Sequence, residues 1–422
     1  MIGAAEAEKE VGIDWYSTGS APCAGRARTS ADDFMVEEQV ELSGLVEGPL
    51  AGYYPVYRVE KQDVDTLHMA QEIAKALKSR VSYGGLKDKR ASAVQYVTPT
   101  SLRGARPSSV VGKNFTAELI GYLPSPLTRA NVVGNRFEVV LRECCAEIGP
   151  AIRDAFRIAE AGGLPNFYGL QRFGVSGPGT HRIGRALVRR EFEEAVRLML
   201  FGGLPGEEDL AIAEGEEMTS GRLGEWVRLL PKGRDVERAV GERLARRPGD
   251  WIGALRGAPI KLRRLYVQAY QSMLFNKTLS IAIGKGEDIS RFQPGDNWAE
   301  ASPDRLRISR VRGVRDPPTT GAVPMAQLVG YAYRDYGSRF DACVREAMEA
   351  EGVSPGQFYV EEMQEVSAEG GFRRPHMALK DGSWTVQGKD ATLRFTLGRG
   401  QYATVLLREV VKAGDPAGSG LA

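Results

Sequence analysis

One carboxylate in a short basic turn is the clearest candidate for chemistry in this sequence. Asp88 lies in Tyr83-Gly84-Gly85-Leu86-Lys87-Asp88-Lys89-Arg90-Ala91, between two segments, Val81 to Tyr83 and Ala93 to Val97, that we predict to be strands. Nearby positive charge lowers the pKa of a carboxyl group. An ionised carboxylate at neutral pH suits a nucleophile or a base, whereas a general acid needs a raised pKa. The alternative is an ordinary charged turn that faces water.

A second unusual stretch covers residues 166–174. Its sequence, Asn-Phe-Tyr-Gly-Leu-Gln-Arg-Phe-Gly, combines aromatic rings with amide side chains and an arginine. Such a combination suits stacking on nucleotides and hydrogen bonding to them. It also suits an aromatic turn that anchors one domain on another. The residues alone leave both interpretations open.

The composition is that of an ordinary globular protein. The chain has 422 residues, a formal net charge of +2, 42% hydrophobic residues and 26% charged residues. This length is enough for two or three domains. No apolar run approaches the roughly 18 residues that span a bilayer, and the acidic N-terminus lacks the pattern of a signal peptide. We therefore expect a cytoplasmic protein that does not enter a membrane.

Cysteine and histidine are scarce and scattered. The four cysteines are Cys23, Cys144, Cys145 and Cys343, and the three histidines are His68, His181 and His376. An adjacent pair with two distant single cysteines does not resemble a disulfide framework. The histidines lack the neighbouring ligands typical of zinc. We expect no metal site and no Ser/His/Asp or Cys/His triad.

Positive charge is concentrated locally. The clusters are Arg305, Arg307, Arg310, Arg312 and Arg315; Arg182, Arg185, Arg189 and Arg190; and Lys261, Arg263 and Arg264. Basic patches on a nearly neutral protein fit contact with a nucleic-acid backbone. Solvated surface paired with nearby acids is the alternative for each cluster.

The elements that must position these residues form three sections. The predicted strands are 53–59, 93–97, 136–142 and 391–397, and the predicted helices are 65–79, 150–161, 186–200, 207–213, 234–245, 260–283, 339–351 and 402–411. Pro55 favours an edge position or a bulge. Residues 413–422 are small and polar, and we predict that they are disordered. A mixed beginning, a mostly helical middle and a return to strand and helix indicate an insertion that splits a first domain.

Five short motifs, taken together and in order, resemble the TruD family of pseudouridine synthases. They are Arg28 followed by Asp32-Asp33-Phe34-Met35-Val36-Glu37-Glu38; Gly85-Leu86-Lys87-Asp88-Lys89-Arg90-Ala91; Gly134-Asn135-Arg136-Phe137; Asn166 to Gly174; and Gln401-Tyr402-Ala403-Thr404-Val405-Leu406-Leu407-Arg408-Glu409. Any one of them would be weak evidence. The ordered set is specific because it spans residues 28 to 409.

The resemblance implies an α+β fold. The pseudouridine synthase core, a mostly antiparallel mixed sheet with flanking helices, would comprise residues 1–165 and 381–422. A mainly helical α/β TRUD domain would be inserted between them, at residues 166–380. The substrate would be tRNA, with the uridine at position 13 as the usual target. No cofactor or metal would be required, and we expect a monomer.

The resemblance also implies roles for individual residues. Asp88 would be the catalytic aspartate, Phe137 would stack on the target uracil, and Asn135 would hold Asp88. Arg28 would be the basic partner of the carboxylate, at a place where the family often has lysine. The residues expected to bind substrate are Arg28, Lys87, Asn135, Phe137 and Phe173.

Two other functional classes compete with a tRNA pseudouridine synthase. A non-catalytic RNA-binding protein on the same scaffold would not need Asp88, Asn135 and Phe137 together. A glycoside hydrolase usually needs a second carboxylate; the Asp88 turn offers none, although Glu37 elsewhere stays a candidate. A synthase that acts on a different uridine is a further alternative, because nothing in the sequence reads out RNA preference.

Overall fold

The computed structural model of the chain describes residues 2–85, 87, 91–174, 179–202, 220–302, 306–309, 311 and 321–422. Asp88 and the helix predicted at 207–213 lie outside these residues. The first half is mostly strands: β1 (Ile2–Gly3), β2 (Trp15–Tyr16), β3 (Phe34–Val40), β4 (Tyr54–Gln62), β5 (Val81–Tyr83), β6 (Ser92–Pro99), β7 (Ser109–Gly112), β8 (Phe115–Leu123) and β9 (Val132–Leu141). The second half adds β10 (Asn297–Glu300), β11 (Ala322–Leu328), β12 (Gly371–Arg373), β13 (Leu379–Gln387) and β14 (Asp390–Gly398).

One large mixed sheet joins the two ends of the chain. Its strand order is β13-β14-β9-β3-β6-β4-β8-β7, with β5 paired to β6. Among these strands, β3 and β6 run parallel, and every other described pair is antiparallel. The C-terminal strand β14 lies directly beside β9, although more than 240 residues separate Val139 from its partner Leu393. The α+β fold with a mostly antiparallel sheet is therefore confirmed.

Alternation in the sequence explains the central strand β9. Phe137, Val139 and Leu141 are 7%, 0% and 0% exposed, whereas Arg136 is exposed. Successive side chains point to opposite faces of a strand, so these three apolar residues share one face. That face packs into the core together with Phe395 of β14. The predicted half-buried strand is confirmed.

Pro55 lies in β4, which has a neighbour on each side, so β4 is not an edge strand. Its pairing with β8 includes Pro55, but its pairing with β6 begins only at Tyr57. A register shift follows between Val56 and Tyr57. The extra residue at this shift is Ile120 of β8, so the bulge lies in the neighbouring strand. Pro55, which cannot donate a backbone hydrogen bond, lies just before it in a stretch of β4 that is paired on one side only.

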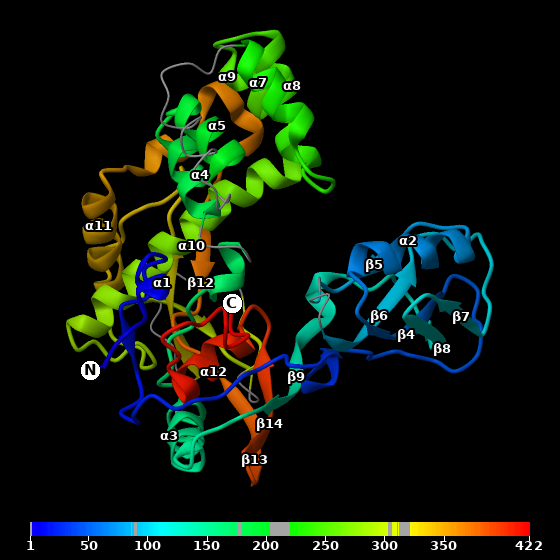
Figure 1. The fold of residues 1–422 in the computed structure, drawn as a ribbon. Coiled ribbons are helices and arrows are strands. Elements are labelled where there is room, and N and C mark those ends of the chain that lie inside the picture. The colour runs from blue at the N-terminus through cyan, green and yellow to red at the C-terminus, as the bar shows by residue number, and fades with distance from the viewer. Residues whose placement is uncertain are drawn as a thin grey trace.

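Seven of the eleven described helices lie in the middle of the chain, between residues 180 and 351. These seven are α4 (Thr180–Val188), α5 (Phe192–Phe201), α7 (Ser220–Leu229), α8 (Asp235–Arg246), α9 (Trp251–Leu255), α10 (Ile260–Gly284) and α11 (Arg339–Glu351). The other four are α1 (Glu6–Lys9), α2 (Thr66–Leu77), α3 (Ile148–Glu160) and α12 (Ala403–Val411). In Figure 1, α7, α8 and α9 lie at the opposite end of the molecule from β13 and β14, with the long helix α10 between them. The small sheet β10-β11-β12 belongs to the same middle section.

The prediction of a single helix over residues 186–200 is wrong. The segment forms α4 and α5, which are separated at Arg189 to Glu191. Arg190 has a left-handed backbone with φ of 61°, a conformation that a continuing right-handed helix cannot contain. The helix predicted over 260–283 is confirmed as α10, which has buried residues on most faces, as a central helix requires.

A buried ion network fastens the N-terminal segment to α12. Arg408 donates a hydrogen bond to Glu8 at 2.6 Å between Nε and Oε1, and Oε2 of Glu409 accepts from the amide nitrogens of Ser17 and Thr18. The side chains of Arg408, Glu8 and Glu409 are 5%, 3% and 0% exposed. The Arg-Glu pair of the closing motif therefore has a structural role.

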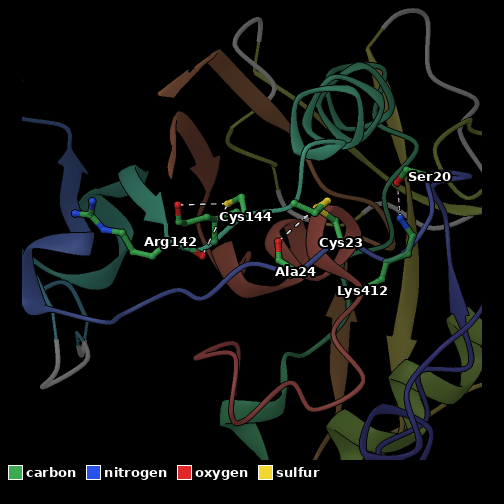
Figure 2. The surroundings of a disulfide bond; sticks show 8 residues. Ser20, Cys23, Ala24, Arg142, Cys144 and Lys412 are labelled. Atoms are coloured by element: carbon green, nitrogen blue, oxygen red, sulfur yellow. Dashed lines mark hydrogen bonds between the residues drawn. A yellow bond between two sulfur atoms is a disulfide. The ribbon is translucent and has the colours of Figure 1, made fainter. Parts of the chain in front are cut away.

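Two expectations about the chain ends and cysteines are wrong. Cys23 and Cys145 form a disulfide across a sequence separation of 122, while Cys144 and Cys343 are free and buried. Figure 2 shows this disulfide beside Cys144 and α12. Residues 413–422 are ordered, because Leu421 is 3% exposed and the carbonyl of Ser419 accepts from the amide of Ala27. Sequence spacing did not reveal either contact, since both partners become neighbours only through the tertiary fold.

In the segments described here, no helix is both long and apolar enough to cross a membrane.

Candidate active site

A small cavity lies where β3, β9 and the α12 end of the chain meet. Its volume is about 170 Å³, and the residues lining it are Arg28, Phe34, Val36, Lys87, Ala91, Asn135, Phe137, Gln171, Gln401, Tyr402, Ala403 and Thr404. Four of the five residues predicted to bind substrate line it: Arg28, Lys87, Asn135 and Phe137. Asp88 is outside the described residues, but both of its nearest described neighbours in sequence, Lys87 and Ala91, line this cavity.

β9 supplies an amide and an aromatic ring to the cavity. Asn135 and Phe137 are two residues apart on one strand, so their side chains lie on the same face. Phe137 stacks on Phe395 with ring centroids 5.4 Å apart and meets the edge of Phe34 at 6.0 Å. Oδ1 of Asn135 is buried and accepts no hydrogen bond from the described residues. The strand thus presents a fixed ring and an available acceptor to one small space.

Arg28 adds a cation from the segment before β3. Its guanidinium carbon lies 4.4 Å from the ring centroid of Phe34, a cation–π contact that holds the side chain against the apolar wall. Its backbone has φ of 58°. The segment is anchored upstream by Arg26, whose amide and carbonyl both pair with Arg142, and by the disulfide at Cys23.

Lys87 is tied to a buried acid. Its ammonium lies 2.8 Å from Oε1 of Glu38, and the two side chains are 9% and 0% exposed. Alternation along β3 turns Glu38 towards Lys87. Glu37, the adjacent candidate for a second carboxylate, does not line this cavity. No carboxylate occurs among the described lining residues, so a two-carboxylate hydrolase mechanism receives no support from them.

Two described residues just before Asp88, Gly85 and Lys87, are held by buried polar groups. The amide of Lys87 donates to Oγ1 of Thr66 at 3.0 Å, and Nε2 of Gln95 donates to the carbonyl of Gly85 at 2.8 Å. Thr66 also donates to Oε1 of Gln95 at 3.0 Å. Thr66 and Gln95 are 1% and 0% exposed. The chain leading into Asp88 is therefore anchored to the first turn of α2 and to β6.

The two glycines before the turn differ in their surroundings. A Cβ atom on Gly84 would lie 2.2 Å from Cγ2 of Val132 and 2.8 Å from Oε1 of Glu38, whereas one on Gly85 would meet nothing within 4 Å. Neither glycine has a positive φ. Gly84 is therefore needed for close approach to β9 and β3. Neither glycine adopts a backbone conformation that excludes other residues, so Gly84 matters for its small size rather than for its flexibility.

Phe173 does not line the cavity. It is fully buried, and its ring meets the edge of the His181 ring with centroids 5.6 Å apart. Burial also lowers the pKa of His181 to about 4, helped by the charge of Arg182. The expectation that Phe173 binds substrate is not supported by this position, since a side chain with no exposed surface packs the core.

The stretch 166–174 mainly anchors one part of the chain to others. Asn166 donates to the carbonyl of Arg374, and the amide of Tyr168 donates to Oδ1 of Asn276 at 2.7 Å. Phe167 is fully buried. Only Gln171 of this stretch lines the cavity, where Thr404 donates to its Oε1 at 2.8 Å. Of the two interpretations left open by the sequence, the anchoring turn fits most of these contacts.

Several lining residues were not singled out from the sequence. They are Gln171, Gln401, Tyr402 and Thr404, all of which lie within recognisable motifs. The motif matches were the signal that could have found these residues. The matches alone do not show that the residues line one cavity, because residues 171 and 404 become neighbours only when α12 packs beside the stretch 166–174.

Most described members of the basic clusters have acidic partners. Arg182, Arg185, Arg189 and Arg190 lie within 3.4 Å of Glu10, Glu351, Glu191 and Glu362, respectively. Arg263 pairs with Glu365, and Arg264 donates to the carbonyl of the same residue. These two clusters therefore fit the alternative in which the basic residues pair with nearby acids. In the third cluster only Arg307 is described.

Comparisons with known proteins identify the family of this chain. The sequence model of the family "tRNA pseudouridine synthase D (TruD)" matches residues 10–410. A "Probable tRNA pseudouridine synthase D" of Pyrobaculum arsenaticum is 32% identical, with 97% of each chain covered. One of Methanopyrus kandleri is 35% identical over 85% of this chain and 86% of its own.

A solved structure extends the agreement to the fold. The crystal structure of a TruD protein from Methanosarcina mazei matches with a TM-score of 0.78 at 26% identity, covering 98% of this chain and 99% of that one. The family match thus covers the strands, the cavity and the helical section alike. This chain belongs to the TruD family of tRNA pseudouridine synthases.

Proposed function

We propose that this protein isomerises a uridine of tRNA to pseudouridine, at position 13, with Asp88 as the catalytic carboxylate. The observation that carries the proposal is the cavity beside the Asp88 turn, which collects Arg28, Lys87, Asn135 and Phe137 from three separate segments. A protein that only binds RNA has no need for an amide, a cation and a ring arranged around one turn.

The reaction is balanced without any other reactant. The N1–C1′ bond of the uridine breaks, the uracil turns within the site, and C5 bonds to C1′. The hydrogen at C5 leaves as a proton, and N1 takes up a proton. The aspartate either attacks the nucleotide or accepts a sugar proton as the glycosidic bond breaks. Both routes need an ionised carboxylate.

The described residues suit the steps around the carboxylate. A uridine in folded RNA must first leave its stack, at a cost of a few kcal/mol. The part of the Phe137 ring that lines the cavity would offer a surface to the extruded base, where stacking contributes about 1–3 kcal/mol. Oδ1 of Asn135 is available to accept a hydrogen bond from substrate or to orient the catalytic turn. Arg28 would stabilise negative charge on the carboxylate or a phosphate.

We extend the proposal to the domain division. Residues 1–165 and 381–422 would form the catalytic domain, and residues 166–380 would form the inserted TRUD domain. Support comes from the large sheet, in which β13 and β14 rejoin β9 after the helical section. β13 begins at Leu379, close to the proposed boundary. We propose that the protein works as a monomer, because one chain supplies every described residue of the cavity.

The test measures release of the C5 hydrogen. tRNA transcribed with tritium at C5 of uridine is incubated with wild type, with Asp88→Asn and with the matched control Asp63→Asn, which changes an exposed aspartate. Wild type and control should release tritium, and Asp88→Asn should release none above background while still binding tRNA. Equal release by all three proteins would refute the role of Asp88.

Two further outcomes separate the alternatives. Absence of release by wild type from any RNA would favour the non-catalytic RNA-binding protein. Pseudouridine sequencing of the treated tRNA locates the product. Modification at another uridine, with position 13 unchanged, would refute the assigned target while keeping the enzyme class.

A further inference from the structure

A second, larger cavity lies directly beside the candidate active site. Its volume is about 510 Å³, and the residues lining it are Ala130, Val132, Val133, Asn166, Leu306, Arg307, Ile308, Phe372, Arg373, Arg374, Arg399 and Gln401. Gln401 lines both cavities. Its Oε1 accepts hydrogen bonds from the backbone amides of Ala378 and Gly398, each at 3.2 Å. These bonds hold the side chain in place between the two cavities. We call the second space the arginine cavity.

The arginine cavity is strongly positive. Arg307, Arg373, Arg374 and Arg399 line it, and no aspartate or glutamate occurs among its described lining residues. The surrounding protein is nearly neutral, with a net charge of +2. Guanidinium groups present planar sets of donors that match phosphate oxygens. Their concentration in one hollow therefore indicates an anionic ligand.

Two of the arginines are built into the wall. The guanidinium carbon of Arg373 lies 4.0 Å from the ring centroid of Tyr168, and its Nη2 donates to Oδ1 of Asn166 at 2.8 Å. Arg374 is 6% exposed and donates from Nε to Nε2 of His376 at 2.8 Å. Because Nε2 accepts, the proton of a neutral imidazole lies on Nδ1, next to the carbonyl of Ile289. These contacts hold positive charge in place before any ligand arrives.

The other two arginines keep donors available. Arg307 pairs through Nη1 with Glu41 at 2.6 Å, but its Nη2 is buried and donates to no acceptor in the described part of the chain. A buried guanidinium nitrogen without an acceptor is costly unless a ligand fills the space. Arg399 is exposed, and its Nη1 donates to the carbonyl of Arg129 at 2.7 Å.

We propose that the arginine cavity binds a backbone phosphate of the RNA strand next to the target uridine. The proposal rests on the proposed function for the identity of the strand. When a nucleotide is flipped into the small cavity, its neighbouring phosphates must lie at the mouth, and the arginine cavity begins across Gln401. The site would fix the register of the strand, since phosphate contacts position a nucleic acid without reading its sequence.

The experiment maps phosphate contacts directly. tRNA ethylated at random phosphates is separated into bound and free fractions by wild type, by Arg399→Gln and by Arg307→Gln. The matched control is Arg246→Gln, which changes an exposed arginine of α8. In wild type, ethylation at one or two adjacent phosphates should exclude tRNA from the bound fraction. The Arg399→Gln and Arg307→Gln proteins should lose that interference, and the control should keep it.

Salt dependence supplies a second measurement. Each phosphate contact contributes about 0.7–0.9 to the slope of log binding constant against log salt. Arg399→Gln should lower the slope by about this amount and weaken binding by about tenfold or more, as expected for a lost charged hydrogen bond. In the tritium assay KM should rise with kcat nearly unchanged, because the phosphate is bound equally before and during the reaction.

The outcomes test the phosphate site and the proposed reaction independently. Interference lost in both variants, at phosphates adjacent to the modified uridine, supports the proposal. Unchanged interference and slope in both variants would overturn it, even if wild type is fully active. Loss of interference with no pseudouridine formed by wild type would keep the phosphate site and refute the proposed reaction. Loss at phosphates far from the modified uridine would overturn the stated position.

Discussion

Reduction of the Cys23–Cys145 disulfide should lower the thermal stability of the protein. The bond closes a loop with a sequence separation of 122 (Figure 2). A cross-link stabilises mainly by restricting the unfolded chain, and a loop of this size corresponds to about 5 kcal/mol in the chain-entropy treatment. For a chain of 422 residues, an unfolding entropy of about 2 cal/mol/K per residue converts this into roughly 5–6 °C in Tm.

The assay has two stages. Thiol titration of the protein unfolded without reductant should find two thiols, Cys144 and Cys343, and reduction should raise the number to four, the total in the sequence. Thermal unfolding is then followed for oxidised wild type, for reduced wild type and for Cys23→Ala/Cys145→Ala. The two proteins without the bond should unfold at similar, lower temperatures.

The control is Cys343→Ala, which removes a buried thiol that takes no part in the bond. Its oxidised form should keep the full response to reductant, whatever the change in its own Tm. Four thiols before reduction would refute the presence of the bond. Two thiols combined with a Tm that reductant does not change would refute the estimate from loop closure, because the restriction of the unfolded chain would then have no effect.

The remaining predictions concern the buried His181 and the two glycines before Asp88. Burial depresses the pKa of His181 from 6.5 to about 4, so the unfolded state binds a proton first and stability should fall by about 3 kcal/mol as pH drops from 6.5 to 4. Urea unfolding across this range should show a weaker decline for His181→Gln; an identical decline would contradict the assignment. Gly84→Ala should lower Tm and kcat, because its Cβ would lie 2.2 Å from a methyl of Val132, whereas Gly85→Ala should leave Tm within about 1 °C of wild type, since single residues in open space change stability little. Equal effects of the two glycine substitutions on Tm and tritium release would refute the close-approach argument.

Local patterns in the sequence predicted most of the described helices but fewer than half of the fourteen described strands. The alternation at Phe137, Val139 and Leu141 gave the central strand, and the apolar residues of 260–283 gave the buried helix α10. Such patterns work because the period of side-chain burial follows from strand and helix geometry. The break at Arg190 escaped prediction, because one left-handed residue leaves no signature in an amphipathic pattern.

The candidate site was predicted from the sequence only in part. Arg28, Lys87, Asn135 and Phe137 were found through motifs, and one cavity brings them together. Phe173 has the right chemical type for stacking but lies in the core. Residue type sets what a side chain can do, whereas burial decides whether a substrate can reach it.

The sequence by itself determined the family, most helices, several strands of the large sheet, and the identity of the catalytic candidate, because these depend on short-range order along the chain. Only the tertiary structure decided which distant residues meet. It placed Glu38 against Lys87, joined Cys23 to Cys145, and arranged arginines from separate segments around one cavity beside Gln401. Contacts of this kind depend on how the sheet and α12 pack, and their partners lie too far apart in sequence for any local pattern to record them.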